Sequence, residues 1–295
     1  MKVIVTGASG LLGKKVAELM LARGYKVFSI YKDHPVTLGT AVKLDLTDGK
    51  SVNTLIHKLK PEAIIHSAAY TDVDGCEDNR KLAWQINAEA TKHIAVASAK
   101  VGAHLIYIST DYVFDGEKGY YREEDIPNPI NYYGYTKLKG EEFVQEYAKS
   151  WCIARTSVIY GWGGSKLNFA TWVIDNLKRG KEVKVLTDQY VSPTLNTNLA
   201  QMLLEIAERK LSGILHTVGA TRVSRWEFAL KLVNVFNLDA KMIKQIKMDE
   251  FLWRAKRPKD SSLDASKCSR ILAKSKPMKI EEALEAMKFE GGGKI

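Results

Sequence analysis

Cysteine is scarce in this chain of 295 residues, which contains only Cys76, Cys152 and Cys268. The three lie far apart and none forms a CxxC pair, so the sequence indicates neither a disulfide framework nor a zinc site. Long apolar runs are also missing, as are the charged, apolar and cleavage regions of a secretory signal. We therefore expect a cytoplasmic protein that does not enter a membrane.

Acidic residues are fewer than basic ones, and the formal net charge is +10. Over most of the chain the basic residues are dispersed among acidic ones, and only the segment 241–279 is clearly rich in lysine and arginine. No nucleic-acid-binding motif accompanies this segment, so we expect no nucleic-acid partner. Most of its lysines are expected on a solvated surface, although such a lobe would also attract a small molecule that carries phosphate.

Short apolar strands alternate with amphipathic helices in the first half of the chain. The expected strands span residues 3–6, 26–31, 42–45, 63–67, 104–109 and 152–155. One helix is expected to begin near residue 11, and others to lie near 79–102 and 133–149. This alternation, without any repeat of fixed period, predicts an α/β fold with a doubly wound parallel sheet and helices on both faces.

A glycine-rich turn joins the first strand to the first helix. The turn consists of Gly7, Ala8, Ser9, Gly10, Leu11, Leu12 and Gly13. Glycines lack a Cβ atom and let the backbone approach a pyrophosphate, while the start of a helix offers free N–H groups and a favourable dipole. The place of the turn between a strand and a helix predicts a dinucleotide site.

Two overlapping tyrosine–lysine pairs occur further along the chain, Tyr133 with Lys137 and Tyr135 with Lys139. Residues four apart on a helix lie within about 40° of each other, so each pair shares a face. The face of the first pair continues through small or apolar residues, namely Gly140, Val144 and Ala148. The face of the second continues through charged residues, namely Glu142, Glu146 and Lys149. We therefore expect the first pair to face inward as a proton-donating pair, the alternative being a buried tyrosine beside a snorkelling lysine.

These motifs together resemble those of an extended short-chain dehydrogenase/reductase, and the resemblance covers nearly the whole chain. The matching elements are the glycine turn, Asp45-Leu46, the stretch 66–69, Asn87, Ser109-Thr110, and Tyr133 with Lys137. Within that superfamily the chain is similar to the dTDP-4-dehydrorhamnose reductase family, through residues 109–116, 128–134, 188–189, 193–194 and 257–258. The first two of these stretches are long and specific.

The resemblance implies that Thr110, Tyr133 and Lys137 are catalytic. Lys137 would lower the pKa of the Tyr133 phenol, whose unperturbed value is about 10. Thr110, rather than Ser109, would donate a hydrogen bond to the substrate carbonyl while Tyr133 protonates the new alkoxide. The alternative for Thr110 is an ordinary hydroxyl at a strand end. The implied activity is the NAD(P)H-dependent reduction of the 4-keto group of a dTDP-4-dehydro-6-deoxy sugar, which converts dTDP-4-dehydrorhamnose to dTDP-rhamnose.

The residue after Asp111 separates this reaction from others of the superfamily. In the sugar-nucleotide dehydratases the catalytic threonine is followed by an Asp-Glu pair, because elimination of water requires an additional acid and base. Here Tyr112 replaces the glutamate. We therefore expect a reductase rather than a dehydratase or an epimerase.

The end of the second strand bears on the choice of cofactor. An acid at this place usually binds the ribose 2′-hydroxyl of NAD, and the residues here are Tyr31, Lys32 and Asp33. If Lys32 faces the ribose, a 2′-phosphate and hence NADP is favoured, whereas Asp33 there would accept NAD. We expect NADP, with NAD as the alternative. The resemblance adds further cofactor contacts, namely Asp45, Leu46, Ala68, Ala69, Tyr70, Asn87, Tyr133 and Lys137.

The C-terminal part is expected to contribute a smaller substrate-binding lobe. The expected layout is a Rossmann-type domain of residues 1–156 and 190–220, a lobe of residues 157–189 and 221–290, and a flexible tail of residues 291–295.

The resemblance implies contacts with the sugar nucleotide from Thr110, Val113, Trp162 and Arg257. The Arg257 guanidinium is a candidate to grip a diphosphate bidentately, although an arginine in a loop could equally form a structural ion pair. Trp162 lies in a glycine-rich loop, where packing is a poorer explanation. For Trp226, at the start of a helix expected at 224–236, a core position is the expectation.

The sequence also bears on a bound metal and on partner proteins. In some members of the family an acid after the glycine turn contributes to a magnesium-linked dimer, but this chain has Lys14 and Lys15 there. We therefore expect no metal, and a homodimer of another kind stays open. The segment 104–141 is also similar to the regulatory beta subunit of methionine adenosyltransferase, which binds NADP within a partner complex. The alternative function is accordingly that of an NADP-binding regulatory subunit without turnover, with a methionine adenosyltransferase as partner.

Overall fold

A parallel sheet of seven strands forms the centre of the computed structural model, which describes residues 1–292; residues 293–295 of the expected tail lie outside the described part. The strands are β1 (Lys2–Thr6), β2 (Lys26–Tyr31), β3 (Thr40–Lys43), β4 (Ala63–His66), β5 (His104–Thr110), β6 (Trp151–Thr156) and β11 (Gly213–His216). Their order in the sheet is β11-β6-β5-β4-β1-β2-β3, and every neighbouring pair is parallel. The direction of winding reverses between β1 and β4, as in a Rossmann-type doubly wound fold. The expected fold is therefore confirmed.

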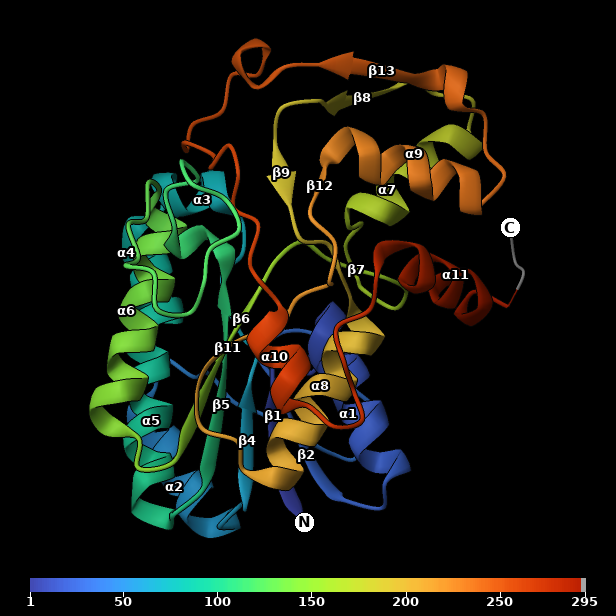
Figure 1. Ribbon diagram of the computed structural model, residues 1–295. Helices are drawn as coiled ribbons and strands as arrows, with labels where there is room; N and C mark the ends of the chain where they lie inside the picture. The colour runs from blue at the N-terminus through green and yellow to red at the C-terminus, as the bar shows by residue number, and fades with distance from the viewer. Residues whose placement is uncertain (293–295) are drawn as a thin grey trace.

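Helices cover both faces of the sheet (Figure 1). One face carries α2 (Gly49–Leu59), α5 (Ala90–Val101) and α6 (Tyr132–Tyr147), and the other carries α1 (Leu11–Ala22), α8 (Asn196–Arg209) and the short α10 (Ser266–Ile271). Because successive side chains of a strand point to opposite faces, the strands supply two separate cores. Ile4 of β1 packs in the core beneath α2 and α5, whereas Val5 packs in the core beneath α1 and α8.

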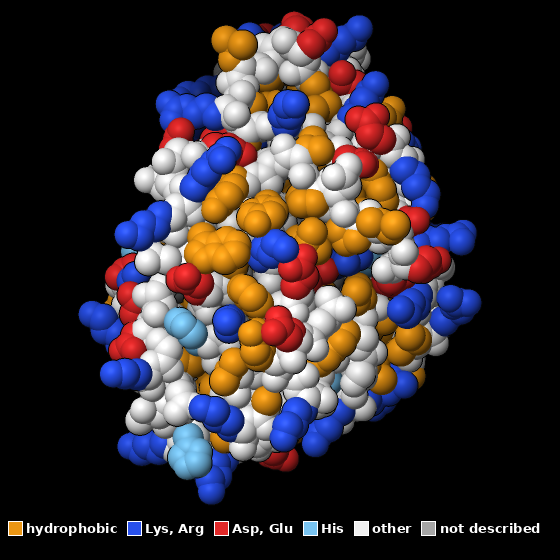
Figure 2. Space-filling view, turned by 90° about the vertical axis from the view of Figure 1, so that its left-hand side faces the viewer, with side chains coloured by type: hydrophobic (Ala, Val, Ile, Leu, Met, Phe, Trp, Pro, Cys, Tyr) orange, Lys and Arg blue, Asp and Glu red, His pale blue; other side chains and the backbone are white. Residues whose placement is uncertain are grey.

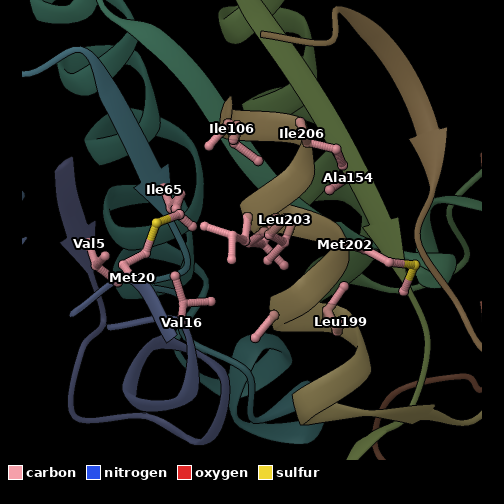
Figure 3. Close-up of a cluster of buried hydrophobic side chains, with 14 of the residues drawn as sticks. Val5, Val16, Met20, Ile65, Ile106, Ala154, Leu199, Met202, Leu203 and Ile206 are labelled. Atoms are coloured by element: carbon pink, nitrogen blue, oxygen red, sulfur yellow. The ribbon is translucent and has the colours of Figure 1, made fainter. Parts of the chain in front are cut away.

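Figure 3 shows the core between the sheet, α1 and α8. Met20 of α1 and Leu203 of α8 lie against Ile65 of β4, and all three side chains are fully buried. Cys152 and Cys268 are buried in the same core as free thiols. Burial raises the pKa of both thiols to about 12, so they are held in the neutral form.

Sequence periodicity located most of these elements to within about two residues. The third strand spans Thr40–Lys43 rather than 42–45, so Asp45 lies beyond its end. The helix expected at 79–102 consists of α4 (Arg80–Trp84), the π-helical segment η1 (Gln85–Glu89) and α5. A π-helical segment adds a residue to a helical turn and often occurs near a functional site.

A smaller lobe stands over the carboxyl ends of the strands (Figure 1). Its helices are α7 (Phe169–Lys178), α9 (Arg225–Val235) and α11 (Ile280–Glu290). Its strands pair as β13 (Ile243–Ile246) with β8 (Val183–Leu186), β12 (Val223–Ser224) with β9 (Tyr190–Val191), and β10 (Thr194–Leu195) with β7 (Ile159–Tyr160). The lobe has its own core, in which Phe228, Leu232 and Leu284 are fully buried. The segment 266–272, which includes α10, packs instead in the core beneath α8.

The two faces of α6 are as the sequence predicts. Lys137 is 3% exposed, and Val144 is buried on the same face, whereas Tyr135 is 38% exposed. Tyr135 stacks on Trp84 of α4, with ring centroids 6.3 Å apart. Figure 2 shows the face of the molecule that carries these helices, where hydrophobic side chains gather and basic side chains are interspersed with acidic ones.

The short elements complete the fold: α3 (Val73–Asp78) and the 3₁₀ turns η2 (Asp111–Val113), η3 (Ala240–Met242) and η4 (Met248–Glu250). Within residues 1–292, every helix is too short or too polar to cross a membrane.

Candidate functional site

A cavity of about 660 Å³ opens beyond the carboxyl ends of β1, β2, β4 and β5, where the small lobe meets the sheet. Its lining includes most of the predicted site residues: Gly7, Ser9, Gly10, Leu11, Leu12, Gly13, Tyr31, Lys32, Asp45, Leu46, Ala68, Ala69, Thr110, Tyr133 and Lys137. Open α/β sheets bind ligands in the crevice where the winding reverses. The cavity occupies that place in this protein.

The glycine turn at one end of the cavity is shaped for close backbone contact. Gly7 has a positive φ of 66°, which favours glycine. At Gly13, a Cβ atom would overlap the carbonyl oxygen of Gly7, so the turn requires glycine there as well. Gly10 caps α1, and no side chain within residues 1–292 accepts a hydrogen bond at this cap. The helix start can therefore receive a pyrophosphate, and the residues present fit a dinucleotide.

Charged side chains lie at the end of β2. The Lys32 ammonium is 2.9 Å from the Asp45 carboxylate, and Lys32, Asp33 and Asp45 all line the cavity. Lys32, together with the Thr47 backbone N–H, lowers the pKa of Asp45 to about 2. Both members of the pair are roughly half exposed. They can therefore meet a ribose or its 2′-phosphate.

The opposite end of the cavity holds the three residues expected to be catalytic. Thr110 ends β5, and its hydroxyl donates to Asp111 Oδ1 at 3.1 Å and accepts from the Tyr112 N–H at 3.2 Å. The pKa of Tyr133 is raised rather than lowered, because burial disfavours the phenolate and outweighs a hydrogen bond with Thr110. The phenol is therefore held in its protonated form, which is the form that donates a proton.

Lys137 lies deep in the wall of the cavity. Its Nζ donates to the Ile108 carbonyl at 2.7 Å and lies 4.1 Å from the centroid of the Tyr107 ring. Burial lowers the pKa of Lys137 to about 7, although the negative charge of Glu141 opposes the change. The charge of this lysine is therefore sensitive to pH near neutrality.

A buried ion pair lies behind the three residues that are expected to be catalytic. Glu141 and Arg155 join through two bonds, Nε to Oε1 at 2.9 Å and Nη2 to Oε2 at 2.7 Å, and both side chains are at most 2% exposed. The Ser109 hydroxyl donates to Glu141 Oε1 at 2.5 Å. Because this hydroxyl proton is directed away from the cavity, the geometry favours Thr110 over Ser109 as the donor to a substrate.

The start of α6 explains how Tyr133 is placed. Asn131 caps the helix and accepts from the Gly134 N–H at 2.8 Å. A Cβ atom at residue 134 would overlap the carbonyl oxygen of Tyr112, so glycine lets η2 pack directly on the helix. The rings of Tyr112 and Tyr133 then meet edge to face, with centroids 6.0 Å apart.

Asn87, Tyr70 and Val113 are expected site residues that do not line the cavity. Asn87 is 1% exposed; its Oδ1 accepts from the Tyr70 N–H at 2.8 Å, and its Nδ2 donates to the Tyr70 carbonyl at 3.1 Å. It therefore braces the loop after β4, which carries Ala68 and Ala69. Val113 is fully buried in a core cluster with Phe114, so packing explains this side chain.

Trp162 and Arg257, expected to touch the substrate, are not among the lining residues of this cavity, and each has a partner within the chain. The Trp162 indole N–H donates to the Met287 carbonyl of α11 at 2.7 Å. Arg257 pairs with Asp74 at 2.9 Å and also donates to the Ala255 carbonyl. Arg257 therefore forms an ion pair in this structure, and its contact with a substrate stays a prediction. Trp226 packs against the core of the lobe, as expected.

Asp111 and Arg225 line the cavity, although neither was expected in the site. Asp111 is 3% exposed, and its second oxygen accepts from the hydroxyls of Ser157 at 2.8 Å and Ser261 at 2.5 Å. The position of Asp111 directly after Thr110 was a signal in the sequence that could have placed it in the site. Arg225 is the first residue of α9, and the capping box of Ser224 marks this helix start in the sequence.

Comparison with known proteins gives consistent results. A family model described as the RmlD substrate binding domain matches residues 1–289. Over 292 residues, the chain is 35% identical to the probable low-salt glycan biosynthesis reductase Agl14 of Haloferax volcanii, with 97% of each covered. It is 35% identical over 280 residues to methionine adenosyltransferase 2 subunit beta of Rattus norvegicus, covering 90% of this chain and 81% of the relative.

A solved structure extends the comparison to the fold. The dTDP-4-dehydrorhamnose reductase of Bacillus anthracis, in complex with NADP, superposes with a TM-score of 0.88 and 36% identity, covering 98% of this chain and 99% of that one. The family match, the relatives and the fold all extend over nearly the full length. The chain therefore belongs to the RmlD substrate binding domain family.

Proposed function

We propose that this protein reduces the 4-keto group of a dTDP-4-dehydro-6-deoxy sugar, converting dTDP-4-dehydrorhamnose to dTDP-rhamnose, with Tyr133 as general acid. The observation that carries the proposal is the presence of Thr110, Tyr133 and Lys137 in one cavity with the glycine turn. The similarity to the Bacillus anthracis reductase supports both the reaction and the cofactor class.

Bound NAD(P)H supplies the hydride to the carbonyl carbon. Thr110 turns its hydroxyl from Asp111 to the carbonyl oxygen and polarises it. Tyr133 gives its phenolic proton to the alkoxide, which completes the alcohol, and a proton from solvent later restores the phenol. Lys137 lies one helical turn away and would place a positive charge near the transient phenolate below about pH 7, where its ammonium keeps its proton.

Asp111 supports reduction over elimination. Its two oxygens accept from three hydroxyls, those of Thr110, Ser157 and Ser261, and burial raises its pKa. A carboxylate held in this way positions Thr110, whereas elimination would need a free base at the sugar. Tyr112 next to it supplies no second carboxyl group.

NADP is the proposed cofactor, with NAD as the second choice. Lys32 at the end of β2 supports this order, because an ammonium can pair with a 2′-phosphate. The pair that it forms with Asp45 is roughly half exposed and can open to admit that phosphate. Asp45 could otherwise accept from the ribose hydroxyls of NAD.

The proposal is tested by following NADPH and NADH consumption with dTDP-4-dehydrorhamnose. Tyr133→Phe is expected to lower kcat by roughly 10²–10⁴-fold, the usual contribution of general acid catalysis. Tyr135→Phe, on the solvent face of the same helix, is the matched control and should keep near-wild-type activity. An inactive Tyr135→Phe beside an active Tyr133→Phe would refute the assignment of the acid.

The second candidate is an NADP-binding regulatory subunit without turnover. It is favoured by the similarity to methionine adenosyltransferase 2 subunit beta over 90% of this chain. Under this alternative the same cavity holds NADP for assembly, and the chain co-elutes with a methionine adenosyltransferase during size-exclusion chromatography. Co-elution together with no consumption of either reduced cofactor would replace the reductase proposal.

A further inference from the structure

Arg225 extends into the cavity from the small lobe, where its guanidinium is held on two sides. Its Nε donates to Gln189 Oε1 at 3.2 Å, and its Cζ lies over the Phe169 ring, 5.1 Å from the centroid. Gln189 is 3% exposed and is itself fixed, because its Nε2 donates to the Pro258 carbonyl and its own carbonyl accepts from the Arg225 N–H. This arrangement orients the guanidinium, and its two terminal nitrogens form no hydrogen bond with residues 1–292, so they can meet a ligand.

The charge of Arg225 has no ion-pair partner within the described part of the chain. No carboxylate among residues 1–292 lies within 4.0 Å of the guanidinium. The negative charge of Asp111 favours the charged form of Arg225. Both oxygens of Asp111, however, already accept hydrogen bonds from hydroxyl groups. Arg257 adds a second positive charge nearby, and burial lowers the pKa of Arg225. A partly buried cation in this situation is stabilised by an anion from outside the chain.

We propose that the terminal nitrogens of Arg225 bind the diphosphate of the nucleotide sugar through two parallel hydrogen bonds. The glycine turn, shaped for the cofactor pyrophosphate, follows β1, whereas Arg225 lies near Asp111 and Tyr112, which follow β5, two strands away in the sheet. We therefore assign the anion at Arg225 to the second ligand. A planar guanidinium matches the oxygens of a phosphate bidentately. Arg225 thus takes the part that the sequence suggested for Arg257, whose Nη2 is occupied by Asp74.

This inference rests on the proposed function for the nature of the substrate, but its test does not require turnover. Binding of dTDP and of thymidine is measured by calorimetry with saturating NADP. Wild type should bind dTDP more tightly than thymidine, which lacks the diphosphate. Arg225→Gln should weaken dTDP binding by about 10–100-fold, the usual range for a lost charge-assisted pair, and leave thymidine and NADP binding unchanged.

Two further variants make the result interpretable. Arg179→Gln removes the same charge from the exposed surface of the lobe, where Arg179 pairs with Asp175, and should bind dTDP as wild type does. Arg225→Lys keeps the charge but not the bidentate geometry, so an intermediate loss is expected; it also carries the test if Arg225→Gln fails to fold.

Three results would overturn the proposal: unchanged dTDP binding by the Arg225 variants, no binding of dTDP by wild type, or a loss confined to NADP. Arg225-dependent binding of dTDP without reduction of the keto sugar would contradict the proposed function alone.

Discussion

Replacement of Lys137 by methionine should abolish turnover and yet stabilise the protein. In the folded chain the pKa of Lys137 falls from 10.5 to about 7, since the ammonium is buried. Each pKa unit corresponds to about 1.4 kcal/mol, so the charged lysine costs on the order of 5 kcal/mol of folding free energy below pH 7. Loss of the bond to the Ile108 carbonyl and of the contact with the Tyr107 ring offsets about 1–3 kcal/mol. A net gain of about 2–4 kcal/mol is expected at pH 6.

The gain should depend on pH in a defined direction. The unfolded chain keeps the lysine proton up to pH 10.5, whereas the folded chain keeps it only up to about pH 7. The cost of the buried charge is therefore complete below pH 7 and fades as the pH rises toward 10.5. We expect the advantage of Lys137→Met to be about 2–3 kcal/mol smaller at pH 9 than at pH 6.

Urea-induced unfolding of the cofactor-free protein at the two pH values measures this difference. Lys139→Met, on the solvent face of α6, is the matched control and should show no comparable gain. A destabilised Lys137→Met at pH 6, or a gain that grows toward pH 9, would refute the account of a buried cation whose charge is costly.

Three further predictions address neighbouring features. Lys32→Ala should raise the KM for NADPH roughly tenfold, because one contact with the 2′-phosphate is lost, and should change the KM for NADH little. Equal effects on both cofactors in steady-state kinetics would count against the pairing of Lys32 with the 2′-phosphate. Glu141→Gln should lower the free energy of unfolding by about 3–5 kcal/mol, measured in urea, since it leaves Arg155 buried without a counter-charge. Trp162→Phe should cost about 1–3 kcal/mol through the lost bond to the Met287 carbonyl, with an unchanged KM for the sugar nucleotide; the reverse result would make Trp162 a substrate contact.

Local periodicity was sufficient to predict the parts of the site that depend on one element and its neighbour. The glycine turn follows from strand–turn–helix order. The inward face of α6 follows from Gly140 and Val144, three and seven positions after Lys137. The third strand was misplaced because Thr40–Lys43 lies at the edge of the sheet, and three of its four residues are exposed. Such a strand lacks the apolar alternation that marks a buried one.

Contacts between segments that are distant in the sequence could not be predicted from it, and the partners of Trp162 and Arg257 are examples. Trp162 donates to a carbonyl 125 residues further along the chain, and Arg257 pairs with an acid 183 residues before it. An indole in a glycine-rich loop or an arginine before a proline has the same local pattern whether its partner is a substrate or another part of the chain. The start of α9 was predictable, but not that its first side chain, Arg225, would reach the cavity.

The π-helical segment η1 fixes the number of residues in the helix that α4, η1 and α5 form together. Its extra residue sets the rotation of α4 relative to α5, while Ile86 and Ala90 line the cavity and Asn87 holds the loop at Tyr70. Deletion of one residue would restore ordinary α-helical winding and turn the preceding segment by about 100°. Length differences among natural homologues should therefore accumulate in the surface loops and be absent from residues 80–101.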